Sequence, residues 1–221
     1  MYILRLLLYN LPGVIIIIYT VKNFTIKYSL KDEPCLQDMI QSVKKAQNDI
    51  FAFLNVPQSL TNIEIVIYSD IHDFHNKVYG QLKEKWNVCA IKEHVIHAVS
   101  PLFPGEIHKY SDMLLILSKA VQDVILNNIF NGIPRWLGIT ILTSKLMTEQ
   151  ITYSKPQLSH FKEPNYHNDS ESYFIANFIL NKFGKNIVLE LLNQPNDYNE
   201  ILHLSDEEID TELEEYYKRS D

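Results

Sequence analysis

Glycine, cysteine and positive charge are scarce in this 221-residue chain. Only six residues are glycine, which leaves no Gly-rich loop of the kind that cradles phosphates. Cys35 and Cys89 lie far apart and form no C-x-x-C pair, so two buried thiols and one disulfide both stay open. The net charge is −7, and no long Lys/Arg cluster relieves it. Because nucleic-acid binding leaves a basic footprint, we expect no nucleic-acid partner.

The apolar N-terminal residues 1–19 have a role that the sequence leaves open. Residues 3–18 contain Arg5 and the breaker pair Pro12-Gly13, whereas a spanning helix needs about 20 apolar residues. No small-x-small cleavage site follows. Three interpretations remain: a short segment and strand packed on the domain, a segment that targets or anchors the chain to a membrane, or an unnatural start site. The compartment therefore stays open between the cytoplasm and a membrane-associated or exported location.

The apolar periodicity of the remaining chain predicts an α+β fold. We expect a small, mixed, twisted sheet with packed helices in residues 20–110, and a central helix with a helical lobe in residues 111–221, together one compact domain. The expected strands are residues 14–29, 63–68 and 94–101, and the expected helices before the centre are residues 35–54 and 71–86. The later expected helices are residues 170–183, 187–193 and 209–218, and the last follows a Ser205–Glu208 capping box.

The chain is organised around residues 111–146. Ser111 is a good N-cap, and apolar residues at helical spacing predict a buried helix to about Phe130. Asn131-Gly132 then ends this helix, because glycine accepts the left-handed conformation of a helix end. Pro134, followed by Arg-Trp-Leu, starts a second helix.

This helix, turn and Pro-Arg-Trp-Leu segment resembles the core of the peptidase MA-like family, a group of gluzincin-type zinc peptidases. In that family the first helix carries H-E-x-x-H, whose histidines bind zinc and whose glutamate activates water; the second helix supplies a third ligand, also a glutamate. These zinc-site positions fall here on Lys119, Ala120, Asp123 and Ile139. No H-E-x-x-H occurs anywhere in the chain. The resemblance therefore implies a zincin-like scaffold that has lost its zinc and its catalytic residues.

The resemblance extends over most of residues 20–219, and the Phe-Gly-Lys tail at 183–185 is one of its most specific parts. It implies that the strand at 94–101 forms the edge above a cleft, where an extended peptide can pair with the main chain. The residues implied in this cleft are Ile96, His97, Ala98, Pro134 and Trp136.

The resulting prediction is a non-enzymatic peptide- or protein-binding pseudopeptidase without a cofactor. One alternative is an active zinc peptidase with substitute ligands, such as Asp123 with a histidine. Another is a decaying gene copy without a selected function. Lys119 and Asp123 are four apart on one helix, so we also weigh an ion pair that fills the space of the metal. The histidine pairs His72/His75 and His94/His97 are weak metal candidates, and on a strand the latter would point to opposite faces.

Overall fold

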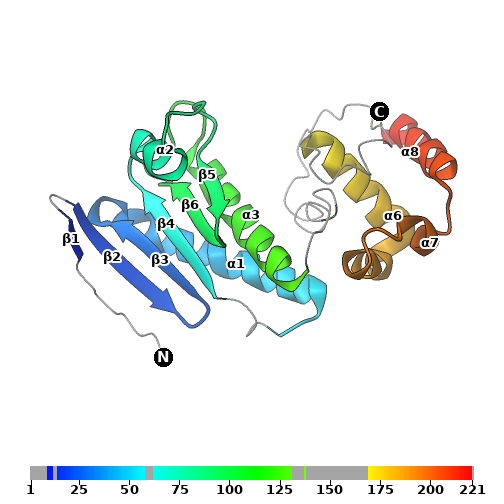
Figure 1. Ribbon diagram of the computed structural model, residues 1–221, viewed down its shortest axis with the longest axis horizontal. Coiled ribbons are helices and arrows are strands. Elements are labelled where there is room, and N and C mark those ends of the chain that lie inside the picture. Colours follow the sequence, from blue (N-terminus) through cyan, green and yellow to red (C-terminus); the bar gives the residue numbers. More distant parts are fainter. Residues whose placement is uncertain (1–8, 12–13, 58–61, 131–136, 138–168, 221) are drawn as a thin grey trace. The chain divides into compact units, whose positions relative to one another are not determined.

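The computed structural model describes residues 9–11, 14–57, 62–130, 137 and 169–220 (Figure 1). The chain divides into two compact units, Met1–Ile125 and Leu126–Asp221. The described strands are β1 (Tyr9–Leu11), β2 (Val14–Val21), β3 (Phe24–Ser29), β4 (Ile63–Tyr68), β5 (Cys89–Lys92) and β6 (Val95–Val99). The described helices are the 3-10 helix η1 (Leu30–Cys35), then α1 (Leu36–Leu54), α2 (Ile71–Tyr79), α3 (Tyr110–Ile129), α6 (Asp169–Asn193), α7 (Tyr198–Leu202) and α8 (Asp206–Ser220).

The first unit is built on one mixed sheet with the strand order β1-β2-β3-β4-β6-β5. Strands β3, β4 and β6 run parallel, while β2 and β5 lie antiparallel to their neighbours β3 and β6. The register places Ile26, Ile65 and Ile96 in one row across the three parallel strands, and all three are fully buried. A mixed sheet with packed helices, followed by a helical C-terminal part, confirms the predicted α+β class.

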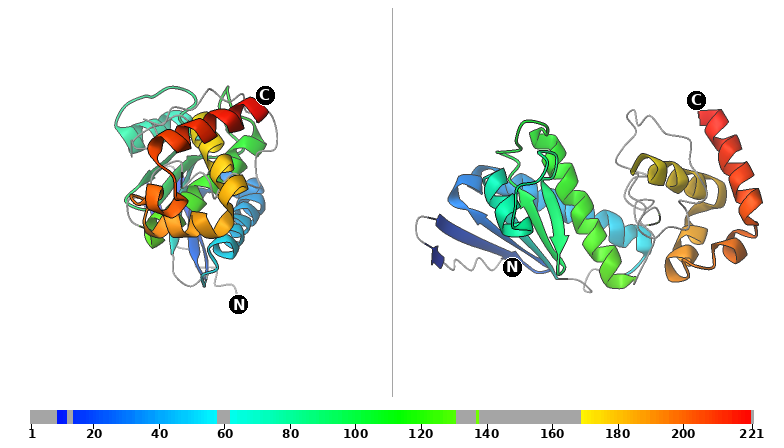
Figure 2. Two further views of the ribbon diagram at one scale, coloured as in Figure 1. Left: turned by 90° about the vertical axis from the view of Figure 1, so that its right-hand side faces the viewer. Right: turned by 45° about the horizontal axis from the view of Figure 1, so that its top comes forward.

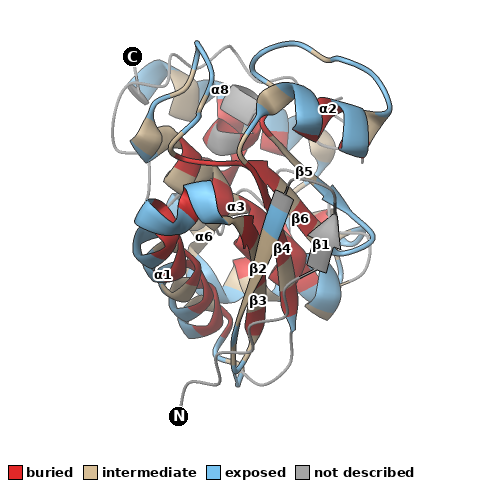
Figure 3. Cartoon of the chain, turned by 90° about the vertical axis from the view of Figure 1, so that its left-hand side faces the viewer, coloured by how far each residue is buried: buried red, intermediate tan, exposed pale blue. Residues whose placement is uncertain are grey.

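Helices α1 and α3 lie side by side on one face of the sheet, and α2 lies on the other (Figures 2 and 3). Two hydrogen bonds join the first pair: Gln122 Nε2 donates to the Ala46 carbonyl at 3.4 Å, and Ser118 Oγ donates to the Ser42 carbonyl at 3.5 Å. The buried side chains of α1 recur at helical spacing, as the sequence predicted. These two helices therefore cover the isoleucine row.

Helix α2 packs on the opposite face through Phe74, which is fully buried. The Phe74 ring meets the Tyr68 ring edge-on, with 5.6 Å between centroids. The expected extension of this helix to residue 86 was wrong, because Gly80 takes φ 72° and ends the helix there. Only glycine adopts this left-handed backbone without a steric penalty, so it closes the helix.

Two hairpins replace single strands that the sequence predicted. The expected strand at 14–29 is divided between β2 and β3, which pair on either side of Lys22-Asn23. The expected strand at 94–101 is the second half of a hairpin, β5–β6, whose turn residues Glu93 and His94 have φ of 50° and 65°. Positive φ at both residues is the geometry that matches the twist of a two-residue hairpin. Neither turn has the Asn-Gly or Asp-Gly signal that reveals such hairpins in a sequence.

The second unit is helical in its described part. Helix α6 contains a kink at Gly184, whose φ of 80° and ψ of 175° are not helical, so the two predicted helices around that glycine are confirmed. The Ser205–Glu208 capping box is also present: Ser205 N donates to Glu208 Oε2 at 2.7 Å, and Glu208 N donates to Ser205 Oγ at 3.3 Å. The short helix α7 was not predicted.

Part of the apolar N-terminal stretch belongs to the sheet, since β1 and the start of β2 fall within residues 3–18. Within the described ranges, no helix has the length and apolar content needed to cross a membrane.

Candidate functional site

The zinc-site positions implied by the resemblance lie on α3 in the first unit. Lys119 and Asp123 are half-buried and four residues apart, so they occupy one face of the helix. Ala120 is buried, at 5% exposure. Of these three side chains only Asp123 has an atom that ligates a metal at neutral pH, since a protonated lysine cannot bind zinc. Ile139 lies outside the described residues, and the Lys119–Asp123 ion pair stays a prediction.

Among the strands that the structure describes, β5 is the last one of the sheet on the side of β6. Val99 N donates to the Val88 carbonyl at 2.8 Å, so Val88 and Val99 form a hydrogen-bonded pair just before β5 begins. Hydrogen-bonded and non-hydrogen-bonded pairs alternate along an antiparallel ladder. Cys89 with Ala98 and Ile91 with Ile96 are therefore non-hydrogen-bonded pairs, and Ala90 with His97 between them is a hydrogen-bonded pair. The main-chain groups of Cys89 and Ile91 consequently face away from β6, toward the sheet edge.

The Cys89 thiol connects this edge with the α3 face. Burial raises the pKa of Cys89 to about 12, and the carboxylate of Asp123 is the next cause. The pKa of the Tyr79 hydroxyl is raised as well, first by burial and then by Cys89. The Tyr79 hydroxyl donates to Asn87 Oδ1 at 2.7 Å, which fixes its ring beside the start of β5. Cys89 is therefore a half-buried thiol of β5 that the charge of Asp123 on α3 reaches.

This environment predicts an unreactive thiol at Cys89. Alkylation requires the thiolate, so at pH 8 we expect iodoacetamide to modify native Cys89 at least about 100-fold more slowly than the urea-unfolded chain. Asp123→Asn should accelerate the native reaction, because it removes the charge that opposes thiolate formation. The rate is followed by mass spectrometry in a Cys35→Ser background, which leaves one thiol. Equal native and unfolded rates would contradict the raised pKa of this half-buried thiol.

The cleft residues implied on the strand at 94–101 are not brought together. Ile96 and Ala98 are buried and share one face of β6, the face on which Ile96 lies beside Ile65. His97 alternates to the opposite face, where its Nδ1 lies 2.9 Å from the Tyr68 hydroxyl. Burial, followed by the charge of Lys92, lowers the pKa of His97. His97 and Asp123 therefore cannot serve one metal, because the sheet separates them.

The expectation that this strand forms the sheet edge was wrong. Strand β6 pairs with β4 on one side and with β5 on the other, over its whole length. A peptide cannot add to a strand whose two edges are occupied. The edge belongs to β5, which sequence periodicity missed because it has four residues and a turn without glycine. Pro134 and Trp136 lie outside the described residues.

The other described histidines have structural or surface positions. His75 is buried, with Nε2 2.8 Å from the Asn87 carbonyl and Nδ1 accepting from Lys83 N at 3.2 Å, so both ring nitrogens are occupied. His72 is exposed, and His94 lies in the hairpin turn. Across the described ranges, no group of three or more His, Cys, Asp or Glu side chains is arranged to hold a metal ion.

Comparisons with known proteins add no relative. No protein-family model, no curated protein and no solved structure matches this chain.

Proposed function

We propose that this chain is a non-catalytic, zincin-like domain of the peptidase MA-like group, which binds an extended peptide or protein segment without hydrolysing it. The observation that carries this proposal is the position of β5. Strand β5 is the edge strand of the described sheet on the side of β6, and α3 carries Lys119 and Asp123 at the positions that the resemblance assigns to zinc-binding histidines. The proposal therefore combines an edge strand that can pair with a peptide and a helix without the histidines that zinc binding requires.

The proposed binding mode is addition of one strand to β5. A peptide strand pairs through main-chain hydrogen bonds, and alternate side chains give specificity. Cys89 and Ile91 supply the outward main-chain groups, and the side chain of Ile91 is 39% exposed. In an antiparallel pair, residues of the peptide opposite Ile91 would meet this apolar side chain on the α3 side of the sheet. We therefore expect a preference for peptides with alternating apolar residues.

The absence of hydrolytic chemistry is tested first by metal content. After dialysis against trace zinc, we expect mass spectrometry to detect less than about 0.1 equivalent of zinc per chain. About one equivalent, lost on Asp123→Ala, would overturn the non-catalytic part of the proposal.

Peptide binding is tested with ligands selected from a displayed library of random ten-residue peptides, whose affinities are then measured by fluorescence anisotropy. The decisive variant is Ile91→Pro, which removes an outward N–H together with the isoleucine side chain, at a position where an edge strand tolerates proline. Ile91→Ala, which truncates the side chain but keeps the N–H, separates the two losses. We expect at least about a tenfold loss of affinity. The matched control Ile91→Val keeps the N–H and the β-branched side chain and should bind as the wild type does. Equal binding by the proline variant would exclude strand addition at β5.

A further inference from the structure

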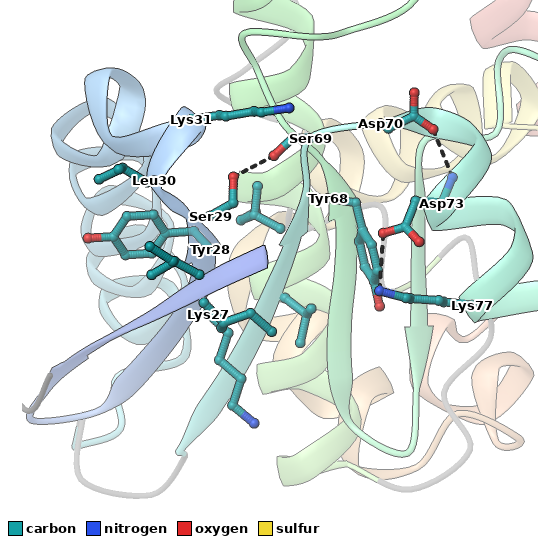
Figure 4. A pocket seen from close by; sticks show the side chains of 14 residues that line it. Lys27, Tyr28, Ser29, Leu30, Lys31, Tyr68, Ser69, Asp70, Asp73 and Lys77 are labelled. Carbon is teal, nitrogen blue, oxygen red and sulfur yellow. Dashed lines mark hydrogen bonds and ion pairs between the residues drawn. The ribbon is translucent and has the colours of Figure 1, made fainter. Parts of the chain in front are cut away.

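A groove of about 650 Å³ opens on the sheet face that α1 and α3 do not cover, and no part of the proposed peptide site contributes to it (Figure 4). Its size falls within the usual range for small-molecule sites. The groove extends over β2, β3 and β4 and is bounded by α2 on one side. Ile16, Val66 and Tyr68 give it an apolar lining. It meets the carboxyl ends of the adjacent parallel strands β3 and β4, where open sheets of this kind bind ligands.

Most of the charges around the groove are neutralised by neighbours. Lys27 pairs with Glu64 at 2.5 Å, and Lys77 pairs with Asp73 at 3.2 Å. The remaining charged lining residues are Lys31 and Asp70.

Lys31 and Asp70 are the charged lining residues of this groove for which the described structure shows no ion pair. Within the described part of the chain, neither side chain has an ion-pair partner, and both residues are exposed. Asp70 uses one oxygen, Oδ1, to accept from Asp73 N at 2.9 Å and so caps α2. The two side chains extend from either side of Ser69 at the same end of the groove (Figure 4). One positive and one negative group thus stand above an apolar surface.

The rim that carries these charges is fixed by a buried carboxylate. Asp32 is fully buried, and its Oδ2 accepts from Ser29 Oγ at 2.8 Å and from Ser69 Oγ at 2.7 Å. The two hydroxyl oxygens are also 2.7 Å apart. The segments that follow β3 and β4, which carry Lys31 and Asp70, are therefore joined through one side chain. A rim held in this way lowers the ordering cost of binding.

We propose that the groove binds a small apolar zwitterion, either a free α-amino acid with an apolar side chain or a short apolar peptide. The ligand carboxylate pairs with Lys31, its ammonium group pairs with Asp70, and its side chain contacts Ile16, Val66 and Tyr68. Opposite charges at one end and an apolar surface below match these three parts of the ligand. The site is separate from β5, so it stands or falls independently of the proposed peptide-binding function.

The test uses the full chain labelled with ¹⁵N and titrated with L-leucine and with Leu-Leu, followed by amide chemical shifts. A ligand of about nine non-hydrogen atoms in an open groove should bind with a dissociation constant on the order of 1 mM. We expect saturable shifts at Ser29, Lys31, Ser69 and Asp70, and none in the β5 edge. Tighter binding of leucine than of Leu-Leu identifies the free amino acid as the ligand class, and the reverse order identifies a peptide.

Two variants and two blocked ligands assign the charges. Asp70→Asn keeps the helix cap, because asparagine caps as well as aspartate, but removes the negative charge. It should lower the affinity for leucine and leucinamide by about two- to fivefold and leave the affinity for N-acetyl-leucine unchanged. Lys31→Met should lower the affinity for leucine and N-acetyl-leucine by a similar factor and leave the affinity for leucinamide unchanged. Lys22→Gln, in the β2–β3 turn and not part of the groove, serves as the charge-matched control and should change nothing.

The proposal is overturned by any of three results. The first would be the absence of saturable shifts with leucine and Leu-Leu up to about 20 mM, which is well above the expected dissociation constant. The second would be saturable shifts at residues outside the groove. The third would be an equal loss of affinity for all ligands in both variants, which would mean that the charges act on the fold and not on the ligand. The peptide-binding measurements with Ile91→Pro are unaffected by each of these results.

Discussion

Three substitutions on α3, Lys119→His, Ala120→Glu and Asp123→His, are expected to give a protein that binds about one equivalent of zinc. The described α3 is a continuous helix through these positions, so side chains at 119 and 123 lie one turn apart on the same face. Two histidines in this arrangement can bind one zinc ion together. The native pair cannot, because a protonated Lys119 offers no ligand atom beside Asp123. We expect the triple variant to bind zinc at least about 100-fold more tightly than the wild type.

Zinc binding by this variant is measured by competition with a chromophoric chelator. Ile139→Glu, which supplies the third ligand implied by the resemblance, should raise the affinity further. The matched control Ala120→Glu with Asp123→His keeps Lys119, offers a single histidine at these two positions and should stay close to the wild type. Ala120 is buried, so the glutamate should lower the thermal stability of the metal-free variant, and zinc should restore part of it. A triple variant that folds but gains no zinc affinity would contradict the assignment of these positions.

Phe74→Ala should cause the largest loss of stability among single substitutions on α2. Phe74 is fully buried and packs edge-on against Tyr68 and Tyr79, at 5.6 and 5.7 Å between ring centroids. Removing the ring leaves a cavity between α2 and the sheet, which typically costs about 3–5 kcal/mol. The same change should weaken ligand binding in the groove, because α2 carries Asp73 and Lys77 of its wall.

Urea unfolding, followed by the fluorescence of Trp86, measures this loss in the first unit. A Trp136→Phe background leaves Trp86 as the only tryptophan of the chain. Phe103→Ala is the matched control, since this phenylalanine is 43% exposed and its truncation should cost less than about 1 kcal/mol. Equal losses for both substitutions would show that Phe74 does not hold α2 on the sheet.

The elements that the sequence predicted well are those with a strong local cause. Helix α1 follows from apolar residues at helical spacing, and the start of α8 follows from a Ser–Glu capping box that forms as expected. The break at Gly184 follows from the conformational freedom of glycine. These signals act within a few residues, so they do not depend on the rest of the fold.

The sheet edge and the groove depended on contacts between distant residues. Strand β5 has four residues and a turn of Glu93-His94, neither of which is typical of a hairpin in sequence. Its pairing with β6 makes β5, and not the His97 strand, the edge among the described strands. Alternation along β6 places His97 on the face opposite Ile96. A register is set by the packing of whole faces against helices, and not by any one residue.

From its residues alone, this chain defines an α+β fold, a central helix with lysine, alanine and aspartate at the positions implied for zinc chemistry, and a helical C-terminal part. Those features follow from side-chain chemistry and short-range periodicity. Only the tertiary structure decided that β5 is the exposed edge, that Cys89 lies beside Asp123, and that Lys31 and Asp70 stand at one end of a groove. Each of these requires segments far apart in the chain to meet, and that arrangement comes from strand pairing and core packing across the whole unit.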